Sequence, residues 1–481
     1  MRLPKLSVLL ATLALVAACG ARLSDEQRAL ATSSGSGGLA PGAAGPVTDV
    51  TVDDAIGDAL GDPIAGEAPT GEVPGGEGGG GGDGGAVEAP AGDEAPSGGG
   101  GGGEQACRPG SATGPGVTPT EITVGNVSQL SGLVPGFGQT GINGAKAYFN
   151  MVNHQGGVCG RTIKMVVADD RFQAATNRAE TEKMADRVLA LVGSTSVVDD
   201  GGAPVIDARG LPDVSLATTK ARTAAANNFS PNPIPPDPGA GNGLRGILEY
   251  FKRTEGIKKP AIFYQNVATG VNQANSYKVD FAAAGIPVAD ANVYAVNPIS
   301  TNFTTEANHM KSSGVDFVIT VAEVNAMANL ARAFKAVDWF PKVPFYGAQV
   351  YGKKFLQMAG DAAEGTKTGL IFAIPEEADR NPAMAQFSEW YARTAPGADV
   401  DFFALAGWVA ADMFVHALRA AGPDPTQAKI VEELKKLNSY DAHGAVASID
   451  PAGKSAPTCF HIVHVEGGRW VKKHPAEGFA C

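Results

Sequence analysis

Two runs of small hydroxyl residues each follow a short apolar segment of this 481-residue chain. They are Gly193-Ser194-Thr195-Ser196 and Ala217-Thr218-Thr219. The first run is expected to open into a helix, and hydroxyls and backbone amides at a helix N-terminus suit an anion such as a carboxylate. The alternative is that these hydroxyls only cap the helix. The first run is therefore a candidate site for a carboxylate.

Signals for catalysis or metal binding are weak. Segment 452–455, Ala-Gly-Lys-Ser, resembles part of a phosphate-binding loop, but Ser448 stands where the first glycine is needed and no clear strand precedes it. No Gly-x-Ser-x-Gly motif occurs. His461 and His464 lie three apart in an expected strand, which puts them on opposite faces, and surface positions are expected for both. The sequence predicts no enzyme, no metal and no cofactor.

The five cysteines indicate an oxidising compartment. Setting Cys19 aside leaves four, an even number that predicts two disulfides among three possible connectivities. Cys107 and Cys159 each precede one of two strands expected to be neighbours, which favours their pairing. Cys459 and Cys481 bracket the C-terminal segment, which favours the second pair. A zinc site is the competing interpretation, but no Cys-x-x-Cys occurs.

Short apolar segments alternate with segments that repeat apolar residues every three or four positions, which predicts alternating strands and helices. The expected strands are 122–127, 162–168, 190–193, 214–217, 261–264, 288–294, 317–321 and 345–347. The expected helices include 138–153, 174–187, 244–254, 381–395, 402–420 and 426–437. A hairpin is expected from 460–465 and 469–472 about Gly467-Gly468.

This alternation predicts the α/β class, with parallel sheets covered by helices on both faces. The region 107–481 is too long for one such sheet, and the proline-rich segment 230–241 interrupts the alternation. Two lobes are therefore expected. Because ligands bind beyond the carboxyl ends of strands in open sheets, two facing lobes predict a cleft that closes by hinge motion.

Several short motifs, taken in their order and spacing, resemble the leucine/isoleucine/valine-binding-protein family. They are Leu130-Ser131-Gly132, Phe137-Gly138-Gln139, Gly144-Ala145, Gly156-Gly157-Val158, Gly160-Arg161, Asp169-Asp170, Val315-Asp316-Phe317-Val318 and Ala359-Gly360-Asp361-Ala362-Ala363-Glu364-Gly365. The resemblance covers roughly 120–480. It implies the type I periplasmic-binding fold of the proteins that feed ABC importers: two doubly wound, Rossmann-like lobes with parallel sheets, hinged around a central cleft. The lobe ranges expected from this are 107–243 plus 369–456 for lobe 1, and 244–368 plus 457–481 for lobe 2.

The resemblance also implies ligand-binding residues in lobe 1. In the family, the loop corresponding to the first hydroxyl run holds a ligand carboxylate. The serine expected one position further is Val197 here, so Ser196 or the backbone must substitute. Thr219 matches a threonine that contacts ammonium and carboxylate groups, and Phe137 matches an aromatic residue over the ligand, with an ordinary core position as its alternative. The expected lobe 1 residues are Phe137, Ser194, Ser196, Ala217, Thr218 and Thr219.

Lobe 2 departs from the family pattern at three expected ligand positions. Thr269 falls where the family has an aromatic residue, Glu323 where it commonly has a tyrosine, and Gln349 where amino-acid binders hold the carboxylate that pairs with the ligand ammonium. Glu323 is the candidate to supply that charge, with a solvated rim position as its alternative. If it does not, an amide, a small carboxylate or another polar solute fits better than an α-amino acid.

The N-terminus has the pattern of an exported bacterial lipoprotein. Residues 1–18 join a basic start to an apolar segment too short to span a bilayer, and they end in Val-Ala-Ala before Cys19. This resembles a lipobox, which implies cleavage before Cys19 and its acylation. An ordinary secretory signal is the alternative. The expected location is the outer side of a cell membrane, in the periplasm or on the outer face.

Residues 19–106 are expected to form a disordered tether. Segment 33–106 holds 25 glycines and 13 acidic residues with no Lys or Arg, so it cannot bury enough apolar surface to fold. The formal net charge of −12 lies in this segment, which leaves residues 107–481 near neutral with 34 basic and 35 acidic residues. This balance excludes a nucleic-acid binder with a basic face and a polybasic membrane-surface module.

These observations favour a tethered, monomeric solute-binding lipoprotein. It is expected to capture a small polar ligand (an amino acid, an amide or a small carboxylate) and to deliver it to the membrane subunits of an ABC importer. The expected partners are that ligand, the permease and, through acylated Cys19, the lipid bilayer. The alternatives are a ligand sensor of the same fold, a cell-envelope enzyme, and a fold that has lost its ligand and acts only as an interaction module.

Overall fold

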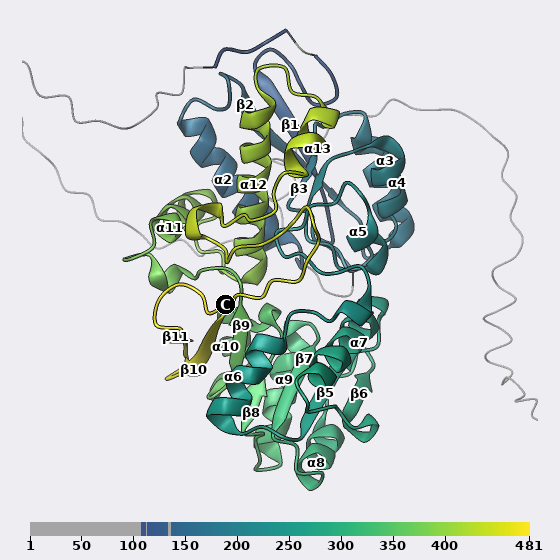
Figure 1. The fold of residues 1–481 in the computed structure, drawn as a ribbon, viewed down its shortest axis with the longest axis vertical. Helices are drawn as coiled ribbons and strands as arrows, with labels where there is room; N and C mark the ends of the chain where they lie inside the picture. Colours follow the sequence, from purple (N-terminus) through teal and green to yellow (C-terminus); the bar gives the residue numbers. More distant parts are fainter. Residues whose placement is uncertain (1–106, 112, 133–135) are drawn as a thin grey trace, which may run out of the picture. The chain divides into compact units, whose positions relative to one another are not determined.

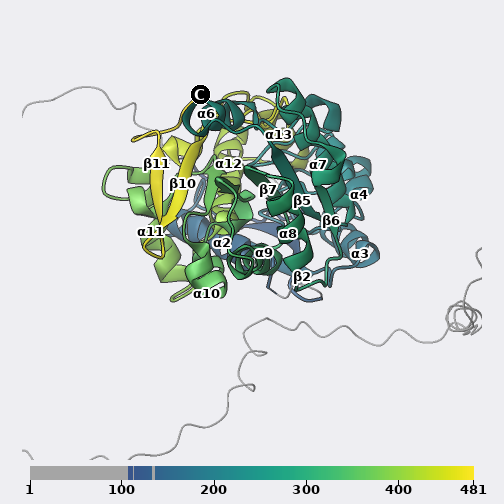
Figure 2. The same ribbon diagram turned by 90° about the horizontal axis from the view of Figure 1, so that it is seen from below.

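The computed structural model describes residues 107–481 of the chain, except residues 112 and 133–135. The expected signal peptide, Cys19 and the expected tether lie outside the described residues. The described strands form two β-sheets, and helices pack on both of them (Figure 1 and Figure 2).

The first sheet has four parallel strands in the order β2-β1-β3-β4. They are β1 (Glu121–Ser128), β2 (Thr162–Asp169), β3 (Leu191–Val192) and β4 (Asp213–Val214). The two long strands pair along their whole length, from Glu121 opposite Thr162 to Ser128 opposite Asp169. Because all four strands run the same way, their carboxyl ends lie along one edge of the sheet.

Helices cover both faces of the first sheet. One face packs against α2 (Gln139–His154) and α12 (Phe402–Ala421), and the apolar residues of the other face pack with α3 (Ala174–Ala185) and α4 (Ala203–Arg209). The remaining helices of this region are α5 (Lys220–Ala224), α11 (Pro382–Thr394) and α13 (Gln427–Leu434).

Glycines allow α2 and α12 to approach each other closely. A Cβ atom at Gly144 would lie 2.0 Å from the carbonyl oxygen of Ala404, and one at Gly407 would lie 2.0 Å from that of Gly141. Any larger residue at these positions would push the helices apart. Among the described helices, α12 is the one whose length and apolar composition would suffice to cross a membrane, and most of it is buried in this contact.

The second sheet has seven strands in the order β11-β10-β9-β8-β7-β5-β6. They are β5 (Pro260–Gln265), β6 (Val293–Val296), β7 (Phe317–Val321), β8 (Val343–Phe345), β9 (Lys367–Leu370), β10 (His461–Glu466) and β11 (Arg469–His474). Strands β5 to β9 are parallel, and the β10–β11 hairpin joins β9 in antiparallel pairing.

Alternate residues of the second sheet enter two different clusters. Ile262 and Phe317 pack with α6 (Arg245–Glu255) and α7 (Ala268–Ala283) on one face. Phe263 and Val318 pack with helices of the other face. Those helices are α8 (Thr304–Ser312), α9 (Val324–Ala336) and α10 (Lys353–Ala359). Short 3-10 turns complete the described elements at η2 (Pro238–Ala240), η3 (Asp290–Asn292), η4 (Ala348–Val350), η5 (Gly360–Ala363), η6 (Pro375–Glu377) and η7 (Ala442–Gly444).

Most expected elements are present within one or two residues of their expected bounds, but four differ and one strand is additional. The expected strand 214–217 ends at Val214, and the expected helix 426–437 ends at Leu434. The expected strand 288–294 begins only at Val293, because Asp290–Asn292 forms the turn η3. The expected strand 345–347 is displaced, since β8 ends at Phe345. Strand β9 was not expected at all. Its lysine and glycine have low strand propensity, and the pairing with β8 and β10 overrides it.

Both expected disulfides are confirmed. Cys107 is bonded to Cys159 and Cys459 to Cys481. The lobe ranges stay a prediction. Strand β9, which spans the expected boundary at 368/369, pairs along its length with the second sheet.

Candidate functional site

A cavity of about 600 Å³ is lined by residues from both sheets. Its lining includes residues that follow β1, β4, β5, β7 and β8, at the carboxyl ends of parallel strands. Seven of the nine expected ligand residues line it: Phe137, Ala217, Thr218, Thr219, Thr269, Glu323 and Gln349. The topology therefore gathers residues from distant parts of the chain at the edge where ligands of such sheets bind.

The two serines expected to bind the ligand do not line the cavity. Ser194 and Ser196 are 3% and 1% exposed. The Ser194 hydroxyl accepts the N–H of Val127 at 3.1 Å, and the Ser196 hydroxyl accepts the N–H of Val198 at 3.2 Å. The expected helix start is also wrong, because turns occupy 197–202 and α4 begins at Ala203. These hydroxyls stabilise the strand end and the turn, and Val197 takes their place in the lining.

A buried carboxylate fixes the second hydroxyl run. Asp199 accepts hydrogen bonds from the backbone N–H of Thr218 at 2.7 Å and of Thr219 at 3.0 Å, and also from the Thr219 hydroxyl. Burial raises the pKa of Asp199 to about 6, while the nearby Arg222 and the threonine hydrogen bonds act in the opposite direction. The turn at Thr218 and Thr219 therefore reaches the cavity in a fixed conformation.

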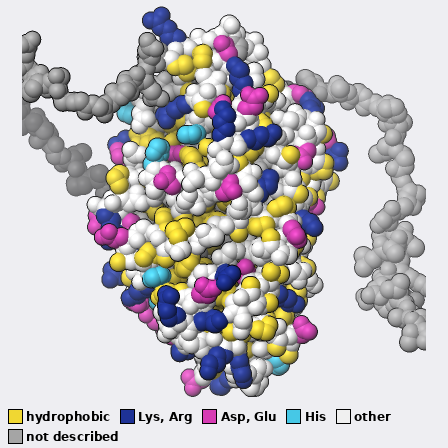
Figure 3. All heavy atoms as spheres, viewed as in Figure 1, with side chains coloured by type: hydrophobic (Ala, Val, Ile, Leu, Met, Phe, Trp, Pro, Cys, Tyr) yellow, Lys and Arg dark blue, Asp and Glu magenta, His cyan; other side chains and the backbone are white. Residues whose placement is uncertain are grey.

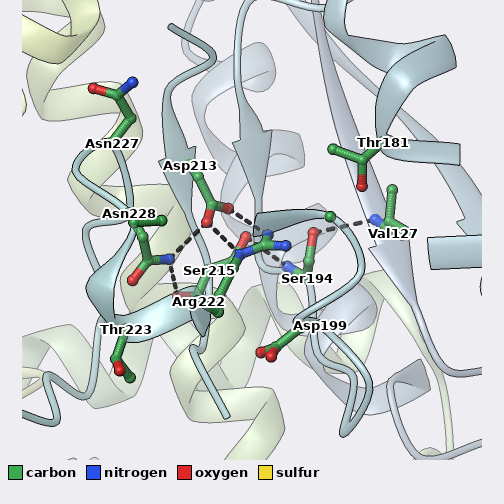
Figure 4. Close-up of polar contacts among 12 residues, drawn as sticks. Val127, Thr181, Ser194, Asp199, Asp213, Ser215, Arg222, Thr223, Asn227 and Asn228 are labelled. Atoms are coloured by element: carbon green, nitrogen blue, oxygen red, sulfur yellow. Dashed lines mark hydrogen bonds and ion pairs between the residues drawn. The ribbon is translucent and has the colours of Figure 1, made fainter. Parts of the chain in front are cut away.

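A buried ion pair lies behind this turn (Figure 4). Arg222 donates from Nε to Asp213 Oδ2 at 2.6 Å and from Nη2 to Oδ1 at 2.8 Å. The Asn228 side chain donates to the same carboxylate at 2.6 Å. The arginine and aspartate side chains are 2% and 0% exposed. Helix α5, which begins after Thr219, is thus tied to strand β4 by two charge-assisted bonds.

Glu323 caps helix α9. Its two carboxylate oxygens accept the N–H groups of Asn325 and Ala326, both at 2.9 Å, and its own N–H donates to Gln265 Oε1 at 2.9 Å. The side chain is half-buried and serves as the cap, and its role toward a ligand stays a prediction. Gln349 lies half-buried in η4 and lines the cavity beside it.

Two further carboxylates, which the sequence did not single out, also line the cavity. Asp401 caps α12, accepting the N–H of Ala404 and the hydroxyl of Thr140, both at 2.9 Å. Burial raises the pKa of Asp401 to about 6. Asp399 accepts the first N–H groups of α10, at 3.1 Å and 3.0 Å. An aspartate before a long apolar helix is a capping signal, but nothing local in the sequence places it at the cavity.

Gln129 is a further lining residue that the sequence did not identify. It follows β1, lines the cavity and is 1% exposed. Its Oε1 atom has no hydrogen-bond partner among the described residues. A buried acceptor without a partner costs roughly 1–3 kcal/mol.

Aromatic and aliphatic side chains form much of the remaining wall. Phe137 and Phe403 meet edge to face with ring centroids 4.7 Å apart. Phe172 and Leu216 add to the side of the first sheet, and Phe355 to the side of the second. The cavity therefore combines an apolar body with a few polar groups, as small-molecule sites do.

The other sequence candidates have structural roles. Lys454, in the segment that resembles a phosphate loop, donates to the carbonyl oxygens of Thr223, Ala225 and Asn228 at 2.8–3.0 Å. His461 is fully buried, not on the surface, and bonds the carbonyl of Phe372 at 2.8 Å. Burial lowers the pKa of His461 to about 3, so it is neutral. No group of three or more potential metal ligands occurs among the described residues.

Comparison with family models matches residues 121–469 to the family described as periplasmic binding protein. Among curated proteins, the Leu/Ile/Val-binding protein homolog 3 of Brucella melitensis is 21% identical over 370 residues, covering 73% of this chain and 93% of that protein. The Leu/Ile/Val-binding protein BraC3 of Rhizobium johnstonii is 24% identical over 363 residues, covering 73% of this chain and 93% of that protein.

Solved structures share the fold at low sequence identity. A fatty acid ABC transporter substrate-binding protein from Thermomonospora curvata has a TM-score of 0.65 at 20% identity, covering 76% of this chain and 94% of that one. A branched-chain amino acid ABC transporter protein from Thermus thermophilus with bound valine has a TM-score of 0.62 at 17% identity, covering 75% and 97%.

Proposed function

Because this chain belongs to the periplasmic binding proteins, with the leucine/isoleucine/valine-binding-protein-like type I fold, we propose that it captures a small organic solute outside the cytoplasm and delivers it to an ABC importer. The observation that carries this proposal is the cavity lined from the carboxyl ends of parallel strands in both sheets. Each side supplies part of the lining, so both sides contact the solute only when they close on it.

The polar groups of the wall support capture rather than turnover. Thr218 and Thr219 are held in place by Asp199, and Gln129 lines the cavity with an unpaired Oε1 acceptor. Groups fixed before binding lose little entropy when a solute arrives. The proposed solutes are amino acids, amides and small carboxylates, bound by a monomer.

The binding test is a thermal-shift screen of amino acids, amides and carboxylates, followed by small-angle scattering. A solute at 100 times its dissociation constant should stabilise the protein by about 2.7 kcal/mol, and the same solute should make the protein more compact. Thr269→Trp, which fills the cavity, should abolish both effects. Thr254→Trp, on an exposed helix end away from the lining, should leave them intact. An unchanged melting temperature and scattering profile across the whole panel would refute the proposal.

We propose further that Cys19 is acylated and anchors the chain to the membrane through residues 19–106. The support is the short apolar segment that ends in small residues before this cysteine. Cells grown with labelled palmitate should yield a labelled, membrane-bound protein, whereas Cys19→Ser should be unlabelled and soluble. Equal labelling of the two proteins would contradict the anchor.

A further inference from the structure

The carboxylates that line the cavity are already engaged. Both oxygens of Glu323 accept N–H groups at the start of α9, and both oxygens of Asp399 accept N–H groups at the start of α10. Asp401 accepts from Ala404 and Thr140. Each charge also faces the positive end of a helix dipole. A ligand ammonium group would therefore have to share each of these oxygens with a donor that is already bound, which makes the pairing weaker than with a free carboxylate.

The lysines that line the cavity have no such partners. Lys220 is the first residue of α5, which follows β4 of the first sheet. Lys354 lies in the first turn of α10, which follows β8 of the second sheet. Neither ammonium group makes an ion pair or a hydrogen bond with the residues that the structure describes. Both lysines are exposed at the cavity, and each side contributes one ammonium group without a partner among the described residues.

The rest of the wall suits an apolar body larger than the side chain of an ordinary amino acid. Phe137, Leu216 and Phe403 line it from the first sheet, and Val324 and Phe355 from the second. A volume of about 600 Å³ falls in the range of pockets that enclose drug-sized ligands.

We propose that the solute of this cavity is an organic monocarboxylate with an extended apolar body and no ammonium group. This inference rests on the proposed function. The carboxylate pairs with Lys220 or Lys354, and closure of the two sides brings both ammonium groups toward it. The apolar body lies against the phenylalanines.

Matched ligands test the head group by calorimetric titration of the full chain. 4-Methylpentanoate has the skeleton of leucine without its amino group, and octanamide has the skeleton of octanoate without its charge. Loss of one charge-assisted contact typically costs about tenfold or more in affinity. We expect 4-methylpentanoate to bind at least tenfold more tightly than leucine, and octanoate at least tenfold more tightly than octanamide.

Lysine variants test the residues. Lys220→Gln and Lys354→Gln should each weaken octanoate binding about tenfold and leave octanamide binding unchanged. Lys353→Gln is the matched control, because this neighbouring exposed lysine does not line the cavity.

The outcomes separate this inference from the proposed function. Tighter binding of leucine than of 4-methylpentanoate, or equal binding of octanoate and octanamide, overturns the inference. So does a complete lack of binding by the three acids 4-methylpentanoate, octanoate and 3-phenylpropanoate. In each of these cases, capture of any other solute from the wider panel leaves the proposed function standing.

Discussion

Replacement of Asp213 by asparagine is expected to lower the free energy of unfolding by about 3–5 kcal/mol. The substitution keeps the shape of the side chain but removes the charge that pairs with Arg222, at 2.6 Å and 2.8 Å. Both side chains are almost completely buried, so the guanidinium would lose its hydrogen-bonded counterion and keep only the charge of the nearby Asp199. The carboxamide would also place an N–H group where Asn228 now donates. Urea unfolding followed by circular dichroism measures the loss.

A surface pair provides the control for this prediction. Arg209 and Asp186 form an ion pair whose side chains are 44% and 68% exposed, and on an exposed surface such pairs contribute little. Asp186→Asn should therefore leave the unfolding curve nearly unchanged. Combined replacement of Asp213 by leucine and Arg222 by methionine should recover much of the lost stability, since no buried charge is then unpaired. Equal effects of the two asparagine variants would contradict the role of the buried pair.

The contribution of Asp199 to stability is expected to fall by roughly 2 kcal/mol as the pH rises from 4 to 7. Burial raises the pKa of this carboxyl from 3.8 to about 6 in the folded protein. Between these two values the folded protein holds a proton that the unfolded chain has released. The stabilisation is therefore complete below the unfolded pKa and is lost as the pH rises through the folded one.

Asp199→Asn isolates this contribution, because the variant cannot titrate at that position. The difference in unfolding free energy between the natural protein and this variant should shrink from pH 4 to pH 7. Asp200→Asn is the control, since this neighbouring side chain is exposed. If Asp199→Asn follows the same pH dependence as the natural protein, the raised pKa is refuted. Because Asp199 holds Thr218 and Thr219, solute affinity should change over the same pH range.

The sequence predicted the architecture well because apolar runs and helical periodicity are local properties. The strand around Ile122 and the helix around Phe149 are determined by which residues must be buried, and the spacing of those residues can be read from the sequence. Strand β9 was not predicted, because its extended conformation comes from pairing with β8 and β10 and not from its own residues. The family resemblance then located seven residues that line the cavity.

The site residues that the sequence missed are those whose positions depend on distant contacts. Thr140 and Asp401 are 261 residues apart and share a hydrogen bond at the cavity. Ser194 is a hydroxyl in the expected loop, but the N–H of Val127 holds it inward. The unpaired Oε1 atom of Gln129 cannot be predicted from the sequence, because its lack of a partner depends on the residues that pack around it. Residue type identified the candidates, and only the packing decided which of them face a solute.

The contact between α2 and α12 has a consequence for how this chain acquires its shape. The partner that fits against Gly144 is Ala404, so the first sheet lacks one of its covering helices until nearly the whole polypeptide has been synthesised. Contacts between such remote segments form slowly, because a long loop must close first. Until that contact forms, one face of the first sheet remains incompletely covered.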